Sequence, residues 1–236
     1  MLSYETLKKQ PRRFLALTGL THREFKTLLP AFGSAYAARY PLTKTQAGKP
    51  RKRRAGGGRH SDLGTLEAKL LFILVYQKTY PLQVVQAELF GLSQSRTNDW
   101  IHRLLPILER ALDRLGVMPE RDGSRLARRE PHSQLIIDGT ERRRQRPKNP
   151  EKQAQHYSGK KKAHSDKNVV VVNAANKRVA FLSATYAGKT HDKKLADNEQ
   201  IVYSRQSTLY KDSGFQGYEP NVKRTYQPKK SPAGAS

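Results

Sequence analysis

Two aspartates stand out in this chain because each follows a short apolar run in a very basic protein. Asp138 ends the segment Leu-Ile-Ile-Asp, and Asp212 ends the segment Leu-Tyr-Lys-Asp. Carboxylate oxygens are the ligands that hard divalent cations prefer. Two of them at strand ends on a cationic surface predict a metal site that cuts nucleic acid. The competing interpretation is that each aspartate only terminates or caps a turn.

The charge of the chain predicts the class of its partner. It contains 45 Lys and Arg against 20 Asp and Glu, a net charge of +25 at pH 7. This surplus exceeds what solubility requires and indicates a polyanion. Nucleic acid is favoured over a membrane, because the charge is spread along the chain and no apolar stretch reaches the roughly 18 residues that span a bilayer.

Redox chemistry and targeting patterns restrict the location. The chain has no cysteine, so it carries neither a disulfide framework nor a thiolate zinc site. Its first residues lack the charged-then-apolar pattern of a signal peptide. A reducing interior such as the cytoplasm is the expected location.

The first part of the chain divides into a helical segment and a linker. Residues 1–48 carry apolar residues at helical spacing, and Thr21 is placed to cap a helix that begins at His22. Residues 49–60 are rich in Lys, Arg and Gly and contain too little apolar surface to pack. They predict a flexible basic linker that can lie along phosphates. A merely solvated loop fits this segment equally well.

Residues 61–130 have the pattern of a helix-turn-helix. An amphipathic helix from Leu66 is followed by a helix from about Leu82 to Phe90, a Gly-Leu-Ser turn and a third helix that opens at Gln94. Glycine suits the left-handed end of the second helix, and serine suits the N-cap of the third. The alternative is an ordinary three-helix bundle with a polar surface.

The third helix has a buried face and an outward face. We expect the buried face to contain Trp100, Ile101, Leu104, Leu108, Leu112 and Leu115, with the indole in the core rather than stacked on a base. The outward residues at its start would meet base edges in the major groove, with Arg96 and Asn98 as the main direct readers. This predicted interface comprises Gln94, Ser95, Arg96, Asn98 and Arg103.

Residues 131–236 predict an α/β domain. A buried strand ends at Asp138, β-branched runs form a hairpin from about Val169 to Thr185, a helix starts near residue 190, and a strand ends at Asp212. This order of strand, hairpin, helix and strand is that of an RNase H-like mixed sheet, in which carboxylates on adjacent central strands converge. The predicted fold class is therefore a helical helix-turn-helix part followed by an RNase H-like mixed sheet.

A basic stretch separates the first strand from the hairpin. Its prolines and charges predict a loop, and its cations would neutralise phosphates beside the acidic pair. Taken alone, such a run is usually only solvated surface. The cations that we expect to contact DNA are Arg142, Arg143, Arg144, Lys160, Lys161 and Lys162.

Four ordered blocks resemble DDE-type bacterial insertion-sequence transposases, in particular the insertion-sequence-five group. The first is Ile-Asp-Gly-Thr-Glu-Arg-Arg-Arg-Gln-Arg-Pro at 137–147, and the second is Tyr-Ser-Gly-Lys-Lys-Lys-Ala-His at 157–164. The third is Gly-Lys-Thr-His-Asp-Lys-Lys at 188–194, and the fourth is Asp-Ser-Gly-Phe-Gln-Gly-Tyr at 212–218. Four blocks in order are far more specific than any one of them.

The resemblance implies an enzyme that uses Mg²⁺, with Mn²⁺ as a substitute, to cleave DNA at the element's ends and transfer the strand to a target. Its partners would be double-stranded DNA with terminal repeats, target DNA and further copies of the chain on that DNA, in the bacterial nucleoid. By position, Asp138 and Asp212 correspond to the first two catalytic metal ligands. His191 and Asp192 would border the site, although Thr190 or Asp192 as a helix cap is the alternative.

The resemblance also implies a third ligand, a glutamate on a later helix. The only acidic residue after Asp212 is Glu219, in a Gly-Tyr-Glu-Pro turn, so the chain is expected to be truncated before that ligand. Two interpretations remain open: a transposase product, completed by a frameshift or inactive, and a non-catalytic DNA-binding regulator of transposition. An RNA-binding basic protein would fit the charge but would leave the four blocks unexplained.

Overall fold

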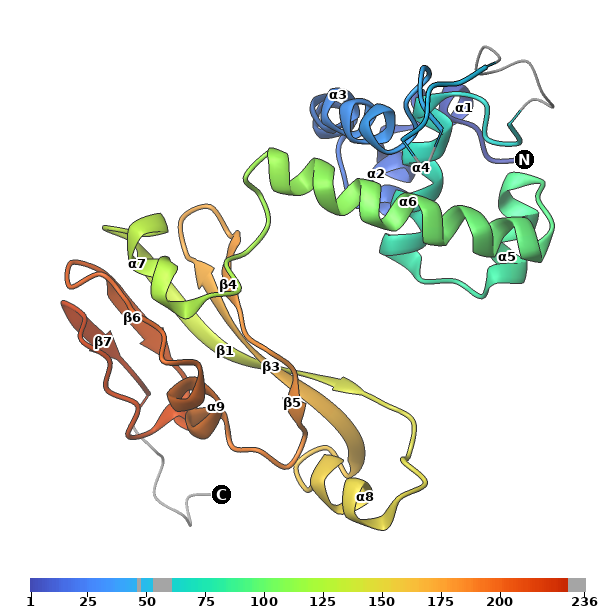
Figure 1. Ribbon diagram of the computed structural model, residues 1–236. Helices are drawn as coiled ribbons and strands as arrows, with labels where there is room; N and C mark the ends of the chain where they lie inside the picture. The colour runs from blue at the N-terminus through green and yellow to red at the C-terminus, as the bar shows by residue number, and fades with distance from the viewer. Residues whose placement is uncertain (46–47, 53–60, 229–236) are drawn as a thin grey trace. The chain divides into compact units, whose positions relative to one another are not determined.

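The structure is a computed structural model that describes residues 1–45, 48–52 and 61–228 (Figure 1). Most of the predicted basic linker, residues 53–60, lies outside the described residues. The chain forms two compact units, Met1–Val117 and Met118–Ser236. No helix among the described residues is long and apolar enough to cross a membrane.

The extended elements of the first unit, among its described residues, are all helices. Its helices begin where the sequence provides N-caps: the Thr21 side chain accepts a hydrogen bond from the Glu24 backbone in a full capping box, and Ser93 does the same for Arg96. The predicted helix starts at His22 and Gln94 are therefore confirmed. The helices are α1 (Tyr4–Leu7), α2 (Pro11–Thr18), α3 (His22–Arg39), α4 (Leu66–Thr79), α5 (Gln83–Phe90) and α6 (Gln94–Arg114).

One apolar core joins all of these helices. Phe14, Phe25 and Phe32 from the N-terminal helices are fully buried in the same cluster as Trp100 of α6. Residues 1–39 therefore pack into the helix-turn-helix rather than beside it. Helix α4 is not amphipathic as predicted, because it runs through the centre of the bundle and is buried continuously from Lys69 to Val75.

The turn between α5 and α6 sets the start of the third helix. Gly91 has a φ of +65° and its N–H closes α5, as the sequence predicts. Most of the predicted buried stripe of α6 lies in the core. Leu115 is the exception and is 39% exposed, because α6 ends before it and Leu115 is the C-cap residue.

The second unit is a mixed sheet with helices against it (Figure 1). The strand order is β2-β3-β1-β6-β7, and β4 and β5 also pair with β3. Its strands are β1 (Gln134–Arg143), β2 (Tyr157–Ser158), β3 (Ala163–Asn173), β4 (Val179–Leu182), β5 (Tyr186–Ala187), β6 (Thr208–Lys211) and β7 (Arg224–Tyr226). Its helices are η1 (Gly123–Arg125), α7 (Leu126–Arg129), α8 (Pro150–His156), α9 (Asp192–Glu199) and η2 (Ser213–Phe215).

The central strand β1 lies between an antiparallel and a parallel neighbour. It pairs antiparallel with β3 from Leu135↔Asn173 to Arg143↔Ser165, and parallel with β6 from Gln134↔Thr208 to Ile137↔Lys211. This helix-decorated mixed sheet is consistent with the predicted RNase H-like α/β fold.

Two details of the predicted first strand are wrong. The strand does not end at Asp138 but continues to Arg143, because the long β3 keeps supplying hydrogen-bonding partners. It is also not buried on both faces: Leu135 and Ile137 are buried, whereas Ile136 is 38% exposed. The alternation places Asp138 on the exposed face.

Part of the predicted basic loop is ordered structure. Asn149 caps α8 by accepting a hydrogen bond from the Lys152 backbone, and Pro150 occupies the first helical position. Strand β2 then pairs with His164 and Ala163 of β3. The Asn-Pro pair was the available signal for this helix start.

The polypeptide before β1 packs on the sheet. The Glu120 backbone pairs with the strand β4 through Leu182 and Ala180, and Leu126 is fully buried in the apolar cluster of the second unit. The compact units accordingly divide after Val117, whereas the sequence placed a boundary at 130/131.

Gly91→Ala should lower the free energy of unfolding by about 1–2 kcal/mol, since a Cβ is disfavoured in the left-handed region. A Cβ there would also lie 2.6 Å from the Met1 sulfur. Urea titration followed by circular dichroism measures the change. Gly64→Ala is the control, because its Cβ would meet nothing within 4 Å and its φ is not in the left-handed region. Equal stability of the two variants would contradict the assigned turn.

Candidate functional site

The two predicted aspartates come together at one edge of the sheet. Asp138 lies on β1 one position beyond the Ile137↔Lys211 pair, and Asp212 directly follows Lys211 at the end of β6. Neighbouring strands are about 4.8 Å apart. The parallel register therefore places the two carboxylates side by side although they are distant in sequence.

Both aspartates open into a single cavity of about 720 Å³. Its wall is the exposed face of β1, β6 and β7, where the rings of Tyr210 and Tyr226 stack at 5.1 Å with an interplanar angle of 13°. The cavity thus combines two carboxylates with an apolar and aromatic wall. Its lining is Ile136, Ile137, Asp138, Tyr210, Lys211, Asp212, Tyr226, Gln227 and Pro228.

The carboxylates of this pair contact only backbone N–H groups among the described residues. Asp138 Oδ1 accepts a bond of 2.7 Å from the Gly139 N–H, and Asp212 Oδ1 accepts one of 2.9 Å from the Gly214 N–H. Neither carboxylate forms an ion pair with a described residue, although the protein is strongly cationic. The remaining lone pairs of two adjacent carboxylates fit a hard divalent cation.

Asp192 lies next to the glycines that follow these two aspartates. Its carboxylate oxygens lie 2.8 Å from the place where a Cβ on Gly139 would sit and 2.9 Å from the corresponding place on Gly214. It also pairs with Lys167 Nζ at 3.3 Å. Glycine after Asp138 and glycine two residues after Asp212 leave the space that this third acid occupies.

The predicted capping alternative is wrong for Thr190 and Asp192. His191 is the N-cap residue of α9 and makes no side-chain capping bond, while Asp192 is the first helical residue. There its negative charge is favourable, because the helix N-terminus carries partial positive charge. His191 is exposed to solvent.

Glu219 has a different partner. Its carboxylate pairs at 2.6 Å with Lys211 Nζ, whose side chain is only 1% exposed. Burial of that ammonium group makes its partner costly to remove. Among the described residues, no three His, Cys, Asp or Glu side chains form a group that could hold a metal ion.

The predicted base-reading residues occupy the start of α6. Gln94, Ser95, Arg96 and Arg103 are exposed, whereas Asn98 is half-buried and donates to Gln83 Oε1 at 3.3 Å. The Arg103 guanidinium lies 5.7 Å from the ring of Trp100. The indole itself is buried, as predicted.

Arg96 is engaged by an acidic partner. Its Nε and Nη2 atoms both donate to Asp62 Oδ2, at 3.0 and 2.8 Å. The segment that carries Asp62 is held in place by Lys69, whose buried ammonium donates to the carbonyls of Leu63 and Gly64. Burial lowers the pKa of Lys69. No periodic spacing relates Asp62 to Arg96, so this pair could not be predicted from the sequence.

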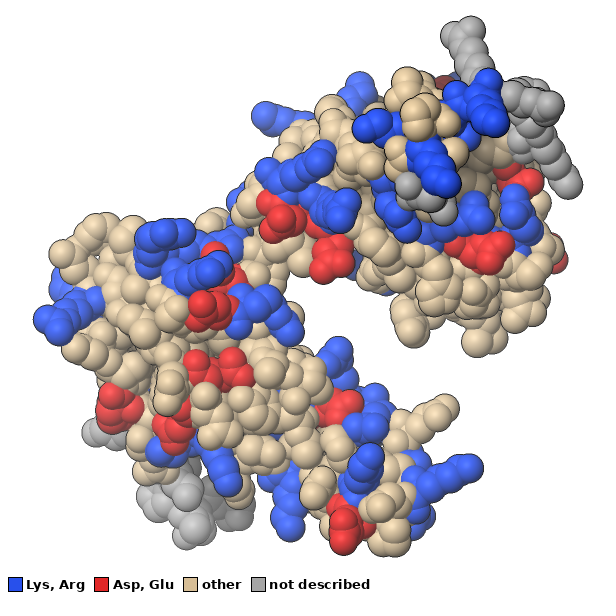
Figure 2. Space-filling model, viewed as in Figure 1, with Lys and Arg blue, Asp and Glu red and all other residues tan. Residues whose placement is uncertain are grey.

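The predicted phosphate-contacting cations divide into two groups. Arg143 and Lys160, Lys161 and Lys162 are exposed. Arg142 donates to Asn168 Oδ1 at 2.8 Å, and Arg144 pairs with Asp166 at 2.9 Å. Figure 2 shows that lysine and arginine side chains are spread over the visible faces of both units.

The first unit carries a helix-turn-helix, and the sheet of the second unit carries two neighbouring carboxylates. Residues 137–235 match the family described as DDE superfamily endonuclease, and residues 61–114 match the helix-turn-helix of DDE superfamily endonuclease. Searches of curated proteins and of solved structures gave no match. The two family matches indicate a DDE-superfamily transposase-like protein with a helix-turn-helix DNA-binding domain, and DNA as its partner.

Arg96→Ala should reduce discrimination between preferred and other DNA sequences by about 1–3 kcal/mol, because a bidentate arginine contact to a base edge is lost. Fluorescence anisotropy with both DNAs, at fixed salt, gives the difference. Arg110→Ala removes an exposed cation further along α6 and is the matched control. An equal loss for all sequences would mean that Arg96 contacts phosphate only.

Proposed function

We propose that this chain is a transposase of the insertion-sequence-five group, which binds element ends through α6 and cleaves and transfers DNA strands at Asp138 and Asp212. One observation carries the proposal: the two aspartates occupy neighbouring positions on the parallel pair β1 and β6 and line one cavity, inside the segment that matches the endonuclease family.

We assign Asp138 and Asp212 as the ligands of Mg²⁺, with Mn²⁺ as a substitute. Their donor set supports this choice, since both are carboxylates whose described contacts are backbone N–H groups. A divalent cation there would supply activation of the attacking oxygen and stabilisation of the leaving oxygen of the phosphodiester. Asp138 and Asp212 would hold the cation beside the DNA, and Asp192 and His191 border the site.

The cationic residues hold the substrate. Arg143 and Lys160 to Lys162 are exposed and belong to the same unit as the carboxylates. They neutralise the phosphates of double-stranded DNA, at terminal repeats and target, without reading its sequence. Sequence preference comes from Gln94, Ser95, Arg96, Asn98 and Arg103.

The second candidate function is regulation of transposition by DNA binding alone. The absence of a three-acid group among the described residues favours it, as does the engagement of Glu219 by Lys211. Nicking of supercoiled plasmid with Mg²⁺ distinguishes the two candidates. Nicking that Asp138→Asn abolishes supports the enzyme, and tight DNA binding without nicking supports the regulator.

Asp138→Asn or Asp212→Asn should weaken Mn²⁺ binding by at least about tenfold, because each removes one anionic ligand. Isothermal titration and the electron paramagnetic resonance signal of free Mn²⁺ both report the affinity. Glu151→Gln is the control, since Glu151 is an exposed acid on α8. Wild-type affinity in both aspartate variants would remove the basis of the assigned site.

Replacing Lys160, Lys161 and Lys162 together by alanine should weaken binding similarly for all DNA sequences. The slope of the salt dependence should fall by the equivalent of up to about three phosphate contacts. The measurement is the slope of the logarithm of affinity against the logarithm of salt concentration. A loss confined to one sequence would contradict the assigned phosphate role.

A further inference from the structure

A second and larger cavity lies in the sheet unit, beside the carboxylate pair. It has a volume of about 1010 Å³ and extends from Tyr157 and Lys160 to Asp192 and Gly214. Gly214 is also the residue whose N–H binds Asp212. The far end of this cavity therefore borders the candidate metal ligands.

The lining of this cavity is cationic. Arg146, Lys160 and Lys189 are exposed residues on its wall, and none of the three forms an ion pair within the described part of the chain. Lys167 also lines it, but its charge is matched by Asp192. The three remaining cations suit an anionic group such as a phosphodiester.

An aromatic platform stands on the same wall. Tyr157 of β2 forms a T-shaped pair with the ring of His164, with centroids 5.6 Å apart at 70°. The tyrosine residue nevertheless remains 45% exposed to solvent. Exposed aromatic faces beside cations are the features on which proteins stack unpaired bases.

Hydrogen bonds hold the walls of the cavity in position. The Gly188 N–H donates to Ser165 O at 3.0 Å, and the Lys189 N–H donates to Gln155 O at 3.1 Å, which ties the segment before α9 to β3 and to α8. These bonds fix one wall of the cavity relative to the other.

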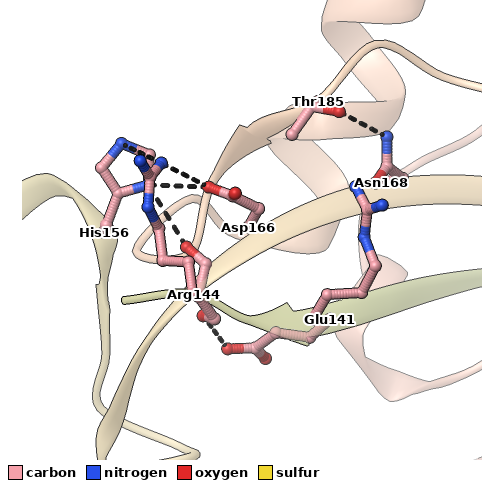
Figure 3. A network of polar contacts seen from close by, with 8 residues as sticks. Glu141, Arg144, His156, Asp166, Asn168 and Thr185 are labelled. Atoms are coloured by element: carbon pink, nitrogen blue, oxygen red, sulfur yellow. Dashed lines mark hydrogen bonds and ion pairs between the residues drawn. The ribbon is translucent and has the colours of Figure 1, made fainter. Parts of the chain in front are cut away.

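A partly exposed polar network supports this arrangement (Figure 3). Asp166 of β3 accepts a hydrogen bond from Arg144 and contacts His156 Nδ1, each at 2.9 Å, so that the end of α8 is fixed to the antiparallel pair of β1 and β3. On the same pair of strands Glu141 accepts a hydrogen bond from Ser165. Burial raises the pKa of Glu141, but hydrogen bonds from Ser158 and Ser165 together with the charges of Lys167 and Lys161 outweigh that effect, so the pKa is lowered.

We infer that this cavity binds an unpaired nucleotide of the DNA strand that leads to Asp138 and Asp212. Its base stacks on Tyr157, and its phosphates lie against Arg146, Lys160 and Lys189. A paired base in a duplex has both faces covered by its neighbours, so only a frayed, flipped or single-stranded nucleotide can use the tyrosine face. The inference rests on the proposed function, because it names the form of DNA that this site accepts.

The test uses the full chain and two fluorescent DNAs of the same sequence, a blunt duplex and a duplex with a short single-stranded overhang. The wild type should bind the overhang duplex about tenfold more tightly, which is the effect of stacking one base. A mononucleotide should compete for the overhang preference, whereas inorganic phosphate alone should not.

Tyr157→Ala should abolish the preference and leave blunt-duplex binding unchanged, and Tyr157→Phe should retain it because stacking needs only the ring. Lys189→Ala should reduce it. The matched controls are Tyr80→Ala and Lys177→Ala, which remove a 77% exposed ring in the first unit and an exposed cation in the turn between β3 and β4. Thermal melting by circular dichroism verifies that every variant is folded.

The outcomes separate this inference from the proposed function. Equal binding of both DNAs by the wild type, or an unchanged preference in Tyr157→Ala, overturns the nucleotide site while the DNA-binding function stands. Failure of the wild type to bind either DNA overturns the proposed function as well.

Discussion

The parallel register between β1 and β6 is the constraint on which the rest of the candidate site depends. It aligns Ile137 with Lys211, so that the residue after each of them is an aspartate and the two aspartates are neighbours. The buried faces of Leu135, Ile137 and Leu209 hold this register, since a slip of one residue would turn apolar side chains outward. The same alternation exposes Asp138. Apolar packing on one face of the sheet thus determines the position of charge on the other.

Asp138 and Asp212 differ from the other acids of the sheet unit in their contacts. In a chain with a net charge of +25, most carboxylates near a cation are neutralised by it, as Asp166 is by Arg144, Asp192 by Lys167 and Glu219 by Lys211. Asp138 and Asp212 instead accept hydrogen bonds from backbone N–H groups. Two adjacent carboxylates without an ion-pair partner among the described residues repel one another, and a divalent cation in the proposed site would relieve this repulsion.

Local rules predicted the elements, and long-range pairing decided the details. Thr21, Gly91 and Ser93 marked helix boundaries correctly because caps and left-handed turns depend on neighbouring residues. The proximity of Asp138 and Asp212 followed from the order of elements, but the extension of β1 to Arg143 did not, because it depends on the length of β3. The pairing of Arg96 with Asp62 and the cavity beside Tyr157 were also missed, since each joins residues that no periodic pattern relates.

The Asp62–Arg96 pair would affect the free energy that Arg96 contributes to the proposed base recognition by α6. Arg96 already makes two charge-assisted hydrogen bonds to one carboxylate oxygen, so a base contact that replaces them contributes only the difference between the two states. Guanine offers two acceptors in the major groove and can match that pair of bonds, whereas a base that offers one acceptor leaves a guanidinium donor unsatisfied. Exposed lysines do not give up an ion pair when they contact phosphate, because their ammonium groups are solvated before DNA binds. In the proposed base recognition, the acidic partner would therefore weaken the affinity that Arg96 contributes to every sequence and increase the fraction of that affinity that depends on the base.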